Sequence, residues 1–395
     1  MKRKYAVIIL ILSMLFNSGC WNRVEPEEIA LIMMVGFERD EEGDGLKIFV
    51  QSANPPKVGS SEEGGGGSQG ESTWAASATG RTVTEALNNL AKKSTRLVDL
   101  SHMGIVLFSE DLAREGIAPL MDFFDRERQS RLITQPMVVE GDLQRVMEAD
   151  FVTEETAASA LTRLHVVARE ELAVSLEIPF RVILNRLSQP GWEIVMPRLR
   201  EVEPQEGEPP PETPMEIDGL AVFKKDRMMG WLNSAETRGY NWIVGRITRP
   251  IYVFESPTRQ GEEISVQVHQ SSTRLEAVTR GEEVAVIVNA VVEGRIEETT
   301  SDEEFLSAQS ELIDSMNRRL GQAVRNDIQA ALKKSQKEFE SDIFGFGNLI
   351  YRTRFQEWEK LENRWDEIFP DLQVEVYVKA EVRRSGLVKD PLIIR

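Results

Sequence analysis

The sequence predicts a multi-domain α+β protein, with mixed or antiparallel sheets and helices packed against them. Hydrophobic residues alternate at period two in several stretches, as in strands, and recur every three to four residues in others, as in helices. The 395 residues are 41% hydrophobic, which is enough apolar surface for more than one core. A Pro/Glu-rich stretch near the middle of the chain divides these elements into two halves.

The chain begins with a short hydrophobic leader. Lys2, Arg3 and Lys4 precede an apolar run at 5–16. As a helix this run would be about 18 Å long, whereas the hydrocarbon core of a bilayer is about 30 Å thick. A basic start before a short apolar run is typical of a secretory signal peptide. We therefore predict that residues 1–19 are a signal peptide.

Cys20 is the only cysteine, and it stands directly after the leader, behind Ser18 and Gly19. A single thiol cannot form an internal disulfide. The arrangement resembles a bacterial lipobox, in which the cysteine is lipidated and the chain is cut before it, although Asn17 stands where an aliphatic residue is usual. The resemblance implies a mature protein that begins at Cys20 and is anchored to a membrane by acyl chains. An ordinary signal peptide with an incidental cysteine and an uncleaved anchor are the alternatives.

The chain is acidic, with a formal charge of −18 at pH 7. Removal of residues 1–19 takes away three basic residues and no acidic one, so the mature chain is more acidic still. An acidic surface repels phosphate backbones, which argues against nucleic acid as a partner. It also repels anionic lipid, so the acyl chains would have to supply the attachment to the membrane.

Residues 20–202 are predicted to form an N-terminal domain of strands and helices, and division into two subdomains stays open. A hairpin is expected from strands at 29–37 and 46–50, and a flexible Gly-rich loop follows at 57–73. The remaining elements expected in this half are a helix at 82–94, a strand at 103–108, a helix capped by Ser109 that continues around Gly116, a strand at 133–141 with Pro136 at an edge or bulge, helices near 153–172 and 175–188, and a strand at 192–202.

Residues 203–216, EPQEGEPPPETPME, are predicted to be a linker, because consecutive prolines among glutamates cannot build a packed element. Residues 217–395 are then a C-terminal α+β domain with a mainly antiparallel sheet. Its expected elements are a hairpin at 217–233, strands at 264–270, 274–278 and 284–294, helices at 303–339 and around 351–365, and a strand at 372–386.

Two of these elements carry predictions about packing. The strand at 284–294 is apolar on both faces, as expected for a central strand that is covered on both sides. The helix at 303–339 has one apolar side and one charged side. We expect it to pack on its own sheet, and coiled-coil pairing with a partner is the alternative.

The sequence predicts no catalytic residue, metal ligand or cofactor. The three histidines, His102, His165 and His269, fall in different elements and outside any metal-binding motif. Residues 65–70 match G-x-G-x-x-G, but no strand precedes them and no helix follows, so a dinucleotide site is not expected. No P-loop or nucleophile elbow is present. Carboxylates that meet only in the folded chain stay open as a catalytic pair.

Residues near the C terminus have predicted structural roles. Asp342 is expected to cap the turn that follows it. Gly345 and Gly347 would allow a positive φ or a close approach of two backbones. Trp358 and Trp365 are expected to anchor the core.

Five stretches of the chain, in order, resemble the Ger(x)C family, the lipoprotein C subunits of nutrient germinant receptors in spore-forming bacteria. The resemblance covers nearly all of residues 19–387, with an expanded Pro/Glu linker and Asn22 in place of the usual acidic residue. The five stretches are GCWNRVEPEEIALIMMVGFERDEEG, GRTVTEALNNL, LSHMGIVLFSEDLAREGIAPLMDFFDRERQSR, IDGLAVFKKDRMMGWLN and ESDIFGFGNLIYRTRFQEWEKLENRW.

The resemblance implies a non-catalytic module, lipidated at Cys20, on the outer face of the spore's inner membrane. Its implied partners are the two integral-membrane subunits of the receptor, A and B. A solute-binding lipoprotein of a transporter is the alternative from another class, and it would need two similar lobes around a cleft. A lipid-anchored hydrolase is the third reading.

Overall fold

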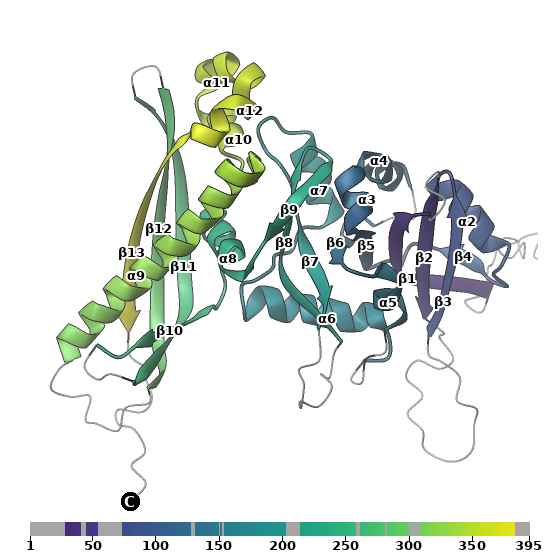
Figure 1. The fold of residues 1–395 in the computed structure, drawn as a ribbon, viewed down its shortest axis with the longest axis horizontal. Coiled ribbons are helices and arrows are strands. Elements are labelled where there is room, and N and C mark those ends of the chain that lie inside the picture. Colours follow the sequence, from purple (N-terminus) through teal and green to yellow (C-terminus); the bar gives the residue numbers. More distant parts are fainter. Residues whose placement is uncertain are drawn as a thin grey trace, which may run out of the picture.

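Two sheets lie along the longest axis of the molecule, each with its own helices (Figure 1). This arrangement confirms the predicted α+β class with mixed and antiparallel sheets. Cys20, the leader and most of the Gly-rich and Pro/Glu stretches lie outside the described residues. The computed structural model describes residues 28–40, 45–53, 73–127, 131–149, 151, 154–202, 214–257, 261–280, 283–299 and 309–383.

The first sheet is mixed and has nine strands in the order β3-β2-β1-β5-β6-β7-β8-β9, with β4 beside β1. The pairs β1–β5, β5–β6 and β6–β7 are parallel, and the hairpins at both ends are antiparallel. The strands are β1 (Ile29–Arg39), β2 (Leu46–Ala53), β3 (Thr73–Gly80), β4 (Leu97–Asp99), β5 (Ile105–Ser109), β6 (Gln135–Glu140), β7 (Val195–Glu201), β8 (Met215–Lys224) and β9 (Arg227–Leu232).

Helices cover both faces of the first sheet because its central strands are apolar on both faces. In β5, Val106 and Phe108 face one core, and Ile105 and Leu107 face the other. The core of Ile105 and Leu107 is closed by α5 and α6, and the opposite core by α2, α3, α4 and α7. These helices are α2 (Val83–Ala91), α3 (Glu110–Glu115), α4 (Ala118–Arg126), α5 (Leu143–Glu148), α6 (Ala157–Glu170) and α7 (Phe180–Leu187).

The second sheet has four strands in the order β10-β11-β12-β13, and the long helix α9 crosses it diagonally (Figure 1). The predicted apolar side of α9 is buried, including Met316, Leu320 and Val324. This helix therefore packs on its own sheet, as expected. The elements are α8 (Ser234–Ile243), β10 (Ile251–Glu255), β11 (Glu263–Arg280), β12 (Glu283–Thr299), α9 (Gln309–Lys333), the π-helical turn η2 (Lys334–Phe339) and β13 (Gln373–Arg383).

The aromatic-rich segment before β13 forms a cap of short helices instead of the single helix that was predicted. Arg354 has φ −140° and ψ 56°, which ends one helix and begins the next. Trp358 and Trp365 are 2% and 5% exposed, so they are core anchors as expected. The cap consists of α10 (Phe346–Thr353), α11 (Phe355–Leu361), the 3₁₀ turn η3 (Glu362–Arg364), α12 (Trp365–Ile368) and the 3₁₀ turn η4 (Phe369–Asp371).

The change from the first sheet to the second does not coincide with the predicted linker at 203–216. Strand β8 begins at Met215, inside that stretch, and pairs antiparallel with β7. The N–H of Val202 donates to the carbonyl of Pro214 at 2.8 Å, so the two ends of the stretch are neighbours. The stretch therefore connects adjacent strands of one sheet, and the sheets change between β9 and β10.

Two further predictions about strands were wrong. Strand β6 is an interior strand, and Pro136 is tolerated because β6 pairs with β7 only from Val138 onward. Strand β12 is central but mainly covered on one face, since Val291 is 40% exposed on the other. The prediction of a mainly antiparallel second sheet agrees with the structure, since the pairs β10–β11 and β11–β12 are antiparallel and only β12–β13 is parallel.

Candidate functional site

The carboxylate of Asp342 is the centre of the loop between η2 and α10. Its Oδ1 accepts hydrogen bonds from the N–H groups of Gly345 and Phe346 at 2.9 and 3.0 Å. Its Oδ2 accepts from the N–H of Gly347 at 2.7 Å and from the indole Nε1 of Trp365 at 3.1 Å. The expected capping role is confirmed, and the carboxylate also holds a distant tryptophan in the helical cap.

Burial dominates the electrostatics of this carboxylate. Removal from water raises the pKa of Asp342 to about 7, and the four hydrogen bonds act in the opposite direction. The four N–H donors bind both oxygens of Asp342, so all four hydrogen bonds are best satisfied when the carboxylate is ionised. Such an arrangement fixes a loop and a helix.

The loop around Asp342 interlocks with the Pro190–Trp192 segment that leads into the first sheet. A Cβ placed on Gly347 would lie 2.8 Å from the Cα of Gly191, and Gly191 itself has φ 60°. The N–H of Asn348 donates to the carbonyl of Gly191 at 3.1 Å. Only glycine allows both backbones to come this close. The helical cap is thereby joined to the start of β7.

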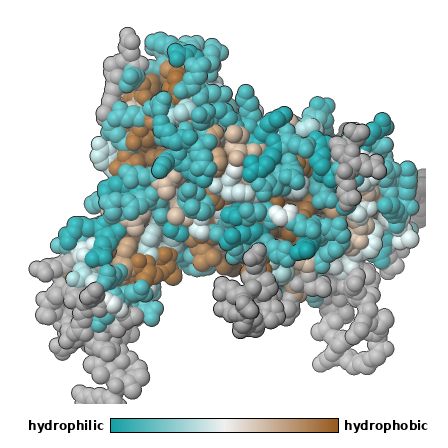
Figure 2. Space-filling view, in the orientation of Figure 1, coloured by the Kyte–Doolittle hydropathy of each residue, from teal (hydrophilic) through white to brown (hydrophobic). Residues whose placement is uncertain are grey.

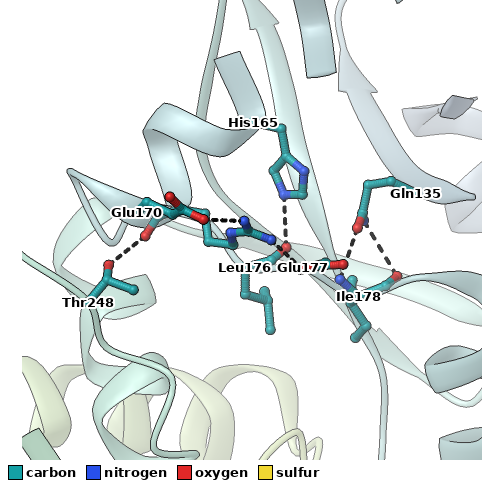
Figure 3. A network of polar contacts seen from close by, with 8 residues as sticks. Gln135, His165, Glu170, Leu176, Glu177, Ile178 and Thr248 are labelled. Carbon is teal, nitrogen blue, oxygen red and sulfur yellow. Dashed lines mark hydrogen bonds and ion pairs between the residues drawn. The ribbon is translucent and has the colours of Figure 1, made fainter. Parts of the chain in front are cut away.

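The segment at 171–179, between α6 and α7, is a second polar centre (Figure 3). The Nε2 atom of His165 lies 2.9 Å from the carbonyl oxygen of Leu176. The amide of Gln135 accepts from the N–H of Ile178 at 2.9 Å and donates to the carbonyl of Ile178 at 3.4 Å. The side chain of Asn241, from α8, donates to the carbonyl of Ser175 at 3.1 Å. This extended segment therefore joins α6, β6 and α8.

Ion pairs and burial reinforce the same segment. Arg169 forms ion pairs with Glu170 and Glu177, and Thr248 donates to the carbonyl of Arg169 at 2.6 Å (Figure 3). Burial lowers the pKa of His165 to about 4, so the imidazole is neutral at pH 7 and donates to the carbonyl. His165 is thus a core histidine with a satisfied hydrogen bond.

A third polar centre lies between α8, α9 and β10. The Nε of Arg238 donates to Oδ2 of Asp327 at 3.1 Å, and the hydroxyl of Tyr252 donates to the same oxygen at 2.8 Å. Trp242 Nε1 donates to the Tyr252 hydroxyl at 3.1 Å. Burial raises the pKa of Asp327, and the Arg238 guanidinium opposes this effect. The cluster holds α8 and α9 against the edge strand β10.

These three centres bind protein groups, and their geometry describes structural joints. Among the described residues, no group of three or more His, Cys, Asp or Glu side chains is arranged to hold a metal ion. His102 and His269 lie in other elements from His165, the first beside Ser101 and the second on β11. None of the helices in the described ranges is both long and apolar enough to cross a membrane.

The capping role of Asp342 was predictable from local sequence, but the contact between its loop and the Pro190–Trp192 segment was not. Gly191 and Asn348 carry no local pattern that points to each other, because they are far apart in sequence. The tripeptide Pro190-Gly191-Trp192 was the available signal, since Pro–Gly marks a turn that uses a positive φ. Cys20, the predicted lipid-attachment residue, lies outside the described residues.

Comparison with known proteins gives matches over nearly the whole chain. The family model described as the spore germination protein N-terminal domain matches residues 22–201, and the one described as spore germination B3/GerAC like, C-terminal, matches residues 218–386. The chain is 24% identical to spore germination protein KC of Bacillus subtilis, with 98% of this chain and 96% of that protein covered. It is 20% identical to spore germination protein B3 of the same organism, with 98% of each covered.

A solved structure shows the same fold. The crystal structure of the GerBC protein superposes with a TM-score of 0.55 at 16% identity, and the match covers 88% of this chain and 96% of that chain. The two family models together span both sheets and the cap, in the order that the five sequence stretches predict. The chain belongs to the Ger(x)C family of GerAC-like spore germination proteins.

Proposed function

We propose that this protein is the lipid-anchored C subunit of a spore nutrient germinant receptor. In this proposal it is a non-catalytic module on the extracytoplasmic face of the spore's inner membrane, and it assembles with integral-membrane A and B subunits to trigger germination. The observation that carries the proposal is the match of both GerAC-type family models, in order, over residues 22–201 and 218–386.

The position of the N-terminal end is consistent with a tether. Strands β1, β2 and β3 lie at the end of the molecule farthest from the second sheet (Figure 1). Eight residues separate Cys20 from Ile29, and the nine steps from one Cα to the next reach about 30 Å when the chain is extended. An anchor on Cys20 would therefore keep the first sheet near the membrane. Confinement there raises the effective concentration beside membrane partners, so a modest interface affinity suffices for assembly.

The polar centres and the topology support a structural module over the alternatives. Asp342, His165 and Asp327 all have protein partners in the described structure. A solute-binding lipoprotein needs two similar lobes, whereas this chain combines a nine-stranded mixed sheet with a four-stranded sheet of different order. The protein is therefore proposed to act through its surfaces.

Cys20→Ala tests the anchor and the role together. The variant should lose its membrane association and should impair germination in response to nutrients, because the acyl chains have no attachment atom. Fractionation of spore membranes and the germination rate of spores carrying the variant are the measurements. Ser18→Ala, two residues away, is the matched control and should keep both properties.

The two readouts separate the parts of the proposal. Full membrane retention of Cys20→Ala would contradict lipid anchoring. Loss of membrane retention with an unchanged nutrient response would contradict the receptor role of the anchored protein.

A further inference from the structure

Strand β13 forms one edge of the second sheet. It pairs with β12 along its length, from Gln373 to Arg383, and the described residues place no strand on its other side. An edge strand presents a row of backbone N–H and C=O groups to any strand that approaches. With eleven residues, this edge is much longer than that of the five-residue β10 on the opposite side of the sheet.

One hydrogen bond tells which backbone groups face outward. The N–H of Val382 donates to Oδ1 of Asn317 on α9 at 2.6 Å, so it points away from β12. The N–H and C=O groups of successive residues point to alternate sides of a strand. Those of Ala380, Val378, Val376 and Val374 therefore also point away from β12. Since α9 already binds Val382, the outward backbone groups that have no strand beside them among the described residues belong to Val374, Val376, Val378 and Ala380.

These outward groups are symmetric about Tyr377. In an antiparallel pair of two copies centred on Tyr377, Val374 lies opposite Ala380, and Val376 lies opposite Val378. These are the residues whose N–H and C=O groups face outward, so both pairs are hydrogen-bonded pairs. The outward groups of one copy therefore meet the outward groups of the other.

The charges on the exposed face of β13 match this register. The Glu375 carboxylate already accepts hydrogen bonds from Gln373 and from the Tyr377 hydroxyl, both at 3.1 Å, and these bonds hold it on the exposed face. In the dimer it would also face Lys379 of the other copy, so the two-fold axis creates two pairs of oppositely charged residues. A register centred on Val378 would instead place Glu375 opposite Glu381, and it would need the N–H group that Asn317 already occupies. Opposite charges stabilise directly facing positions and like charges destabilise them, so the register centred on Tyr377 is favoured.

The opposite face of this edge is hydrophobic and incompletely covered. Val374, Val376 and Val378 are only half-buried, although they lie on the α9 side of the sheet. Figure 2 shows hydrophobic surface along this half of β13, beside α9. A second copy of the strand would cover part of these valines.

We propose that two copies of this chain associate through β13, antiparallel and centred on Tyr377, to form a continuous eight-stranded sheet. The contact is isologous: each Glu375 meets the other copy's Lys379, and the two Tyr377 side chains lie side by side at the axis. The proposal does not depend on the lipid anchor or on the receptor role.

Cysteine cross-linking of the full chain tests this register. In a facing pair without hydrogen bonds the two Cα atoms are about 4.5 Å apart, which lies within the range that disulfides span. Tyr377→Cys should therefore form a disulfide-linked dimer under mild oxidation. Lys379→Cys is the matched control, because its two copies would lie about 13 Å apart along the strands and should not cross-link. The unchanged chain, whose only cysteine is Cys20, reports any link through that thiol.

A charge exchange tests the same contact without new thiols. Lys379→Glu should weaken self-association roughly tenfold, since it replaces two attractive pairs by two repulsive ones. Adding Glu375→Lys in the same chain should restore association, and sedimentation equilibrium measures both. Restored association together with cross-linking at position 377 alone supports the proposal. Cross-linking at both positions, at neither, or of position 377 to another polypeptide would overturn it.

Discussion

His165 shows how burial sets the behaviour of one residue. Its side chain is 7% exposed, and its ring is held by the carbonyl of Leu176 at 2.9 Å. Burial lowers the pKa of the imidazole to about 4, whereas its value in the unfolded chain is 6.5. A metal ligand or a catalytic base would need an accessible ring nitrogen. This histidine instead fixes the segment between α6 and α7.

The same residue gives the protein a defined pH response. Between pH 6.5 and 4 the unfolded chain binds a proton at His165 and the folded chain does not, so stability falls as the pH is lowered through this range. Between pH 7 and pH 4 the free energy of unfolding of the unchanged protein should fall by about 3 kcal/mol more than that of the His165→Gln variant, because glutamine does not titrate. Urea unfolding at a series of pH values measures the difference. Parallel pH profiles of the two proteins would contradict the prediction.

At the scale of elements, the interlocked loops around Asp342 and Gly191 hold the helical cap onto the first sheet. Asn348 Nδ2 donates to Oε1 of Gln189 at 2.7 Å, and the hydroxyl of Ser341 donates to the carbonyl of Phe223 on β8 at 2.6 Å. A loop from the C-terminal half is thus bonded to segments of the N-terminal sheet. The joint depends on backbone contact that any side chain at Gly347 would prevent.

Asp342→Asn tests this joint. Asparagine has the same size, but its NH₂ group would face N–H donors that now bind a carboxylate oxygen. A buried N–H without a partner costs about 1–3 kcal/mol, so the free energy of unfolding should fall by about 3 kcal/mol at pH 8, where Asp342 is ionised.

The matched control is Asp366→Asn, an exposed carboxylate next to Trp365, which should change the stability by less than about 0.5 kcal/mol. Thermal or urea unfolding compares the two variants. Equal losses of unfolding free energy in the two variants would show that the hydrogen bonds to Asp342 do not stabilise the contact between the loop and the first sheet.

At the scale of the whole molecule, the two halves in sequence are not two separate bodies. Strands β8 and β9 follow the Pro/Glu stretch but complete the sheet that β1 to β7 begin. Asn241 on α8 and the Asp342 loop add further bonds between the halves. The two family models divide at the same stretch, so the sequence division and the division between sheets differ.

Cleavage within 203–213 separates these two views. After insertion of a protease site there and complete cleavage, the two fragments should stay together in gel filtration, because β7 and β8 remain paired and buried. Elution of two independent folded fragments would instead support a linker between separate domains. The uncleaved chain with the same insertion is the control for the effect of the insertion itself.

The elements that follow from local pattern were predictable from the sequence. Alternating hydrophobic residues predicted the β1–β2 hairpin, a serine before an acidic turn predicted the cap at Ser109, and three- to four-residue spacing predicted the buried side of α9. Helix α8 was missed although Asn233 and Glu236 form a capping box, which is a local signal. Strand β3 was missed because its small residues Ala75, Ala76 and Ser77 have weak strand preference.

By itself the sequence determined the types of most elements, the acidic character and the capping role of Asp342. Only the tertiary structure decided that β8 joins the first sheet, that β13 lies parallel to β12 and that Gly191 meets Gly347. The reason is physical. Periodicity and capping arise from residues a few positions apart, whereas strand order and close backbone approach depend on contacts between segments that only the folded core brings together.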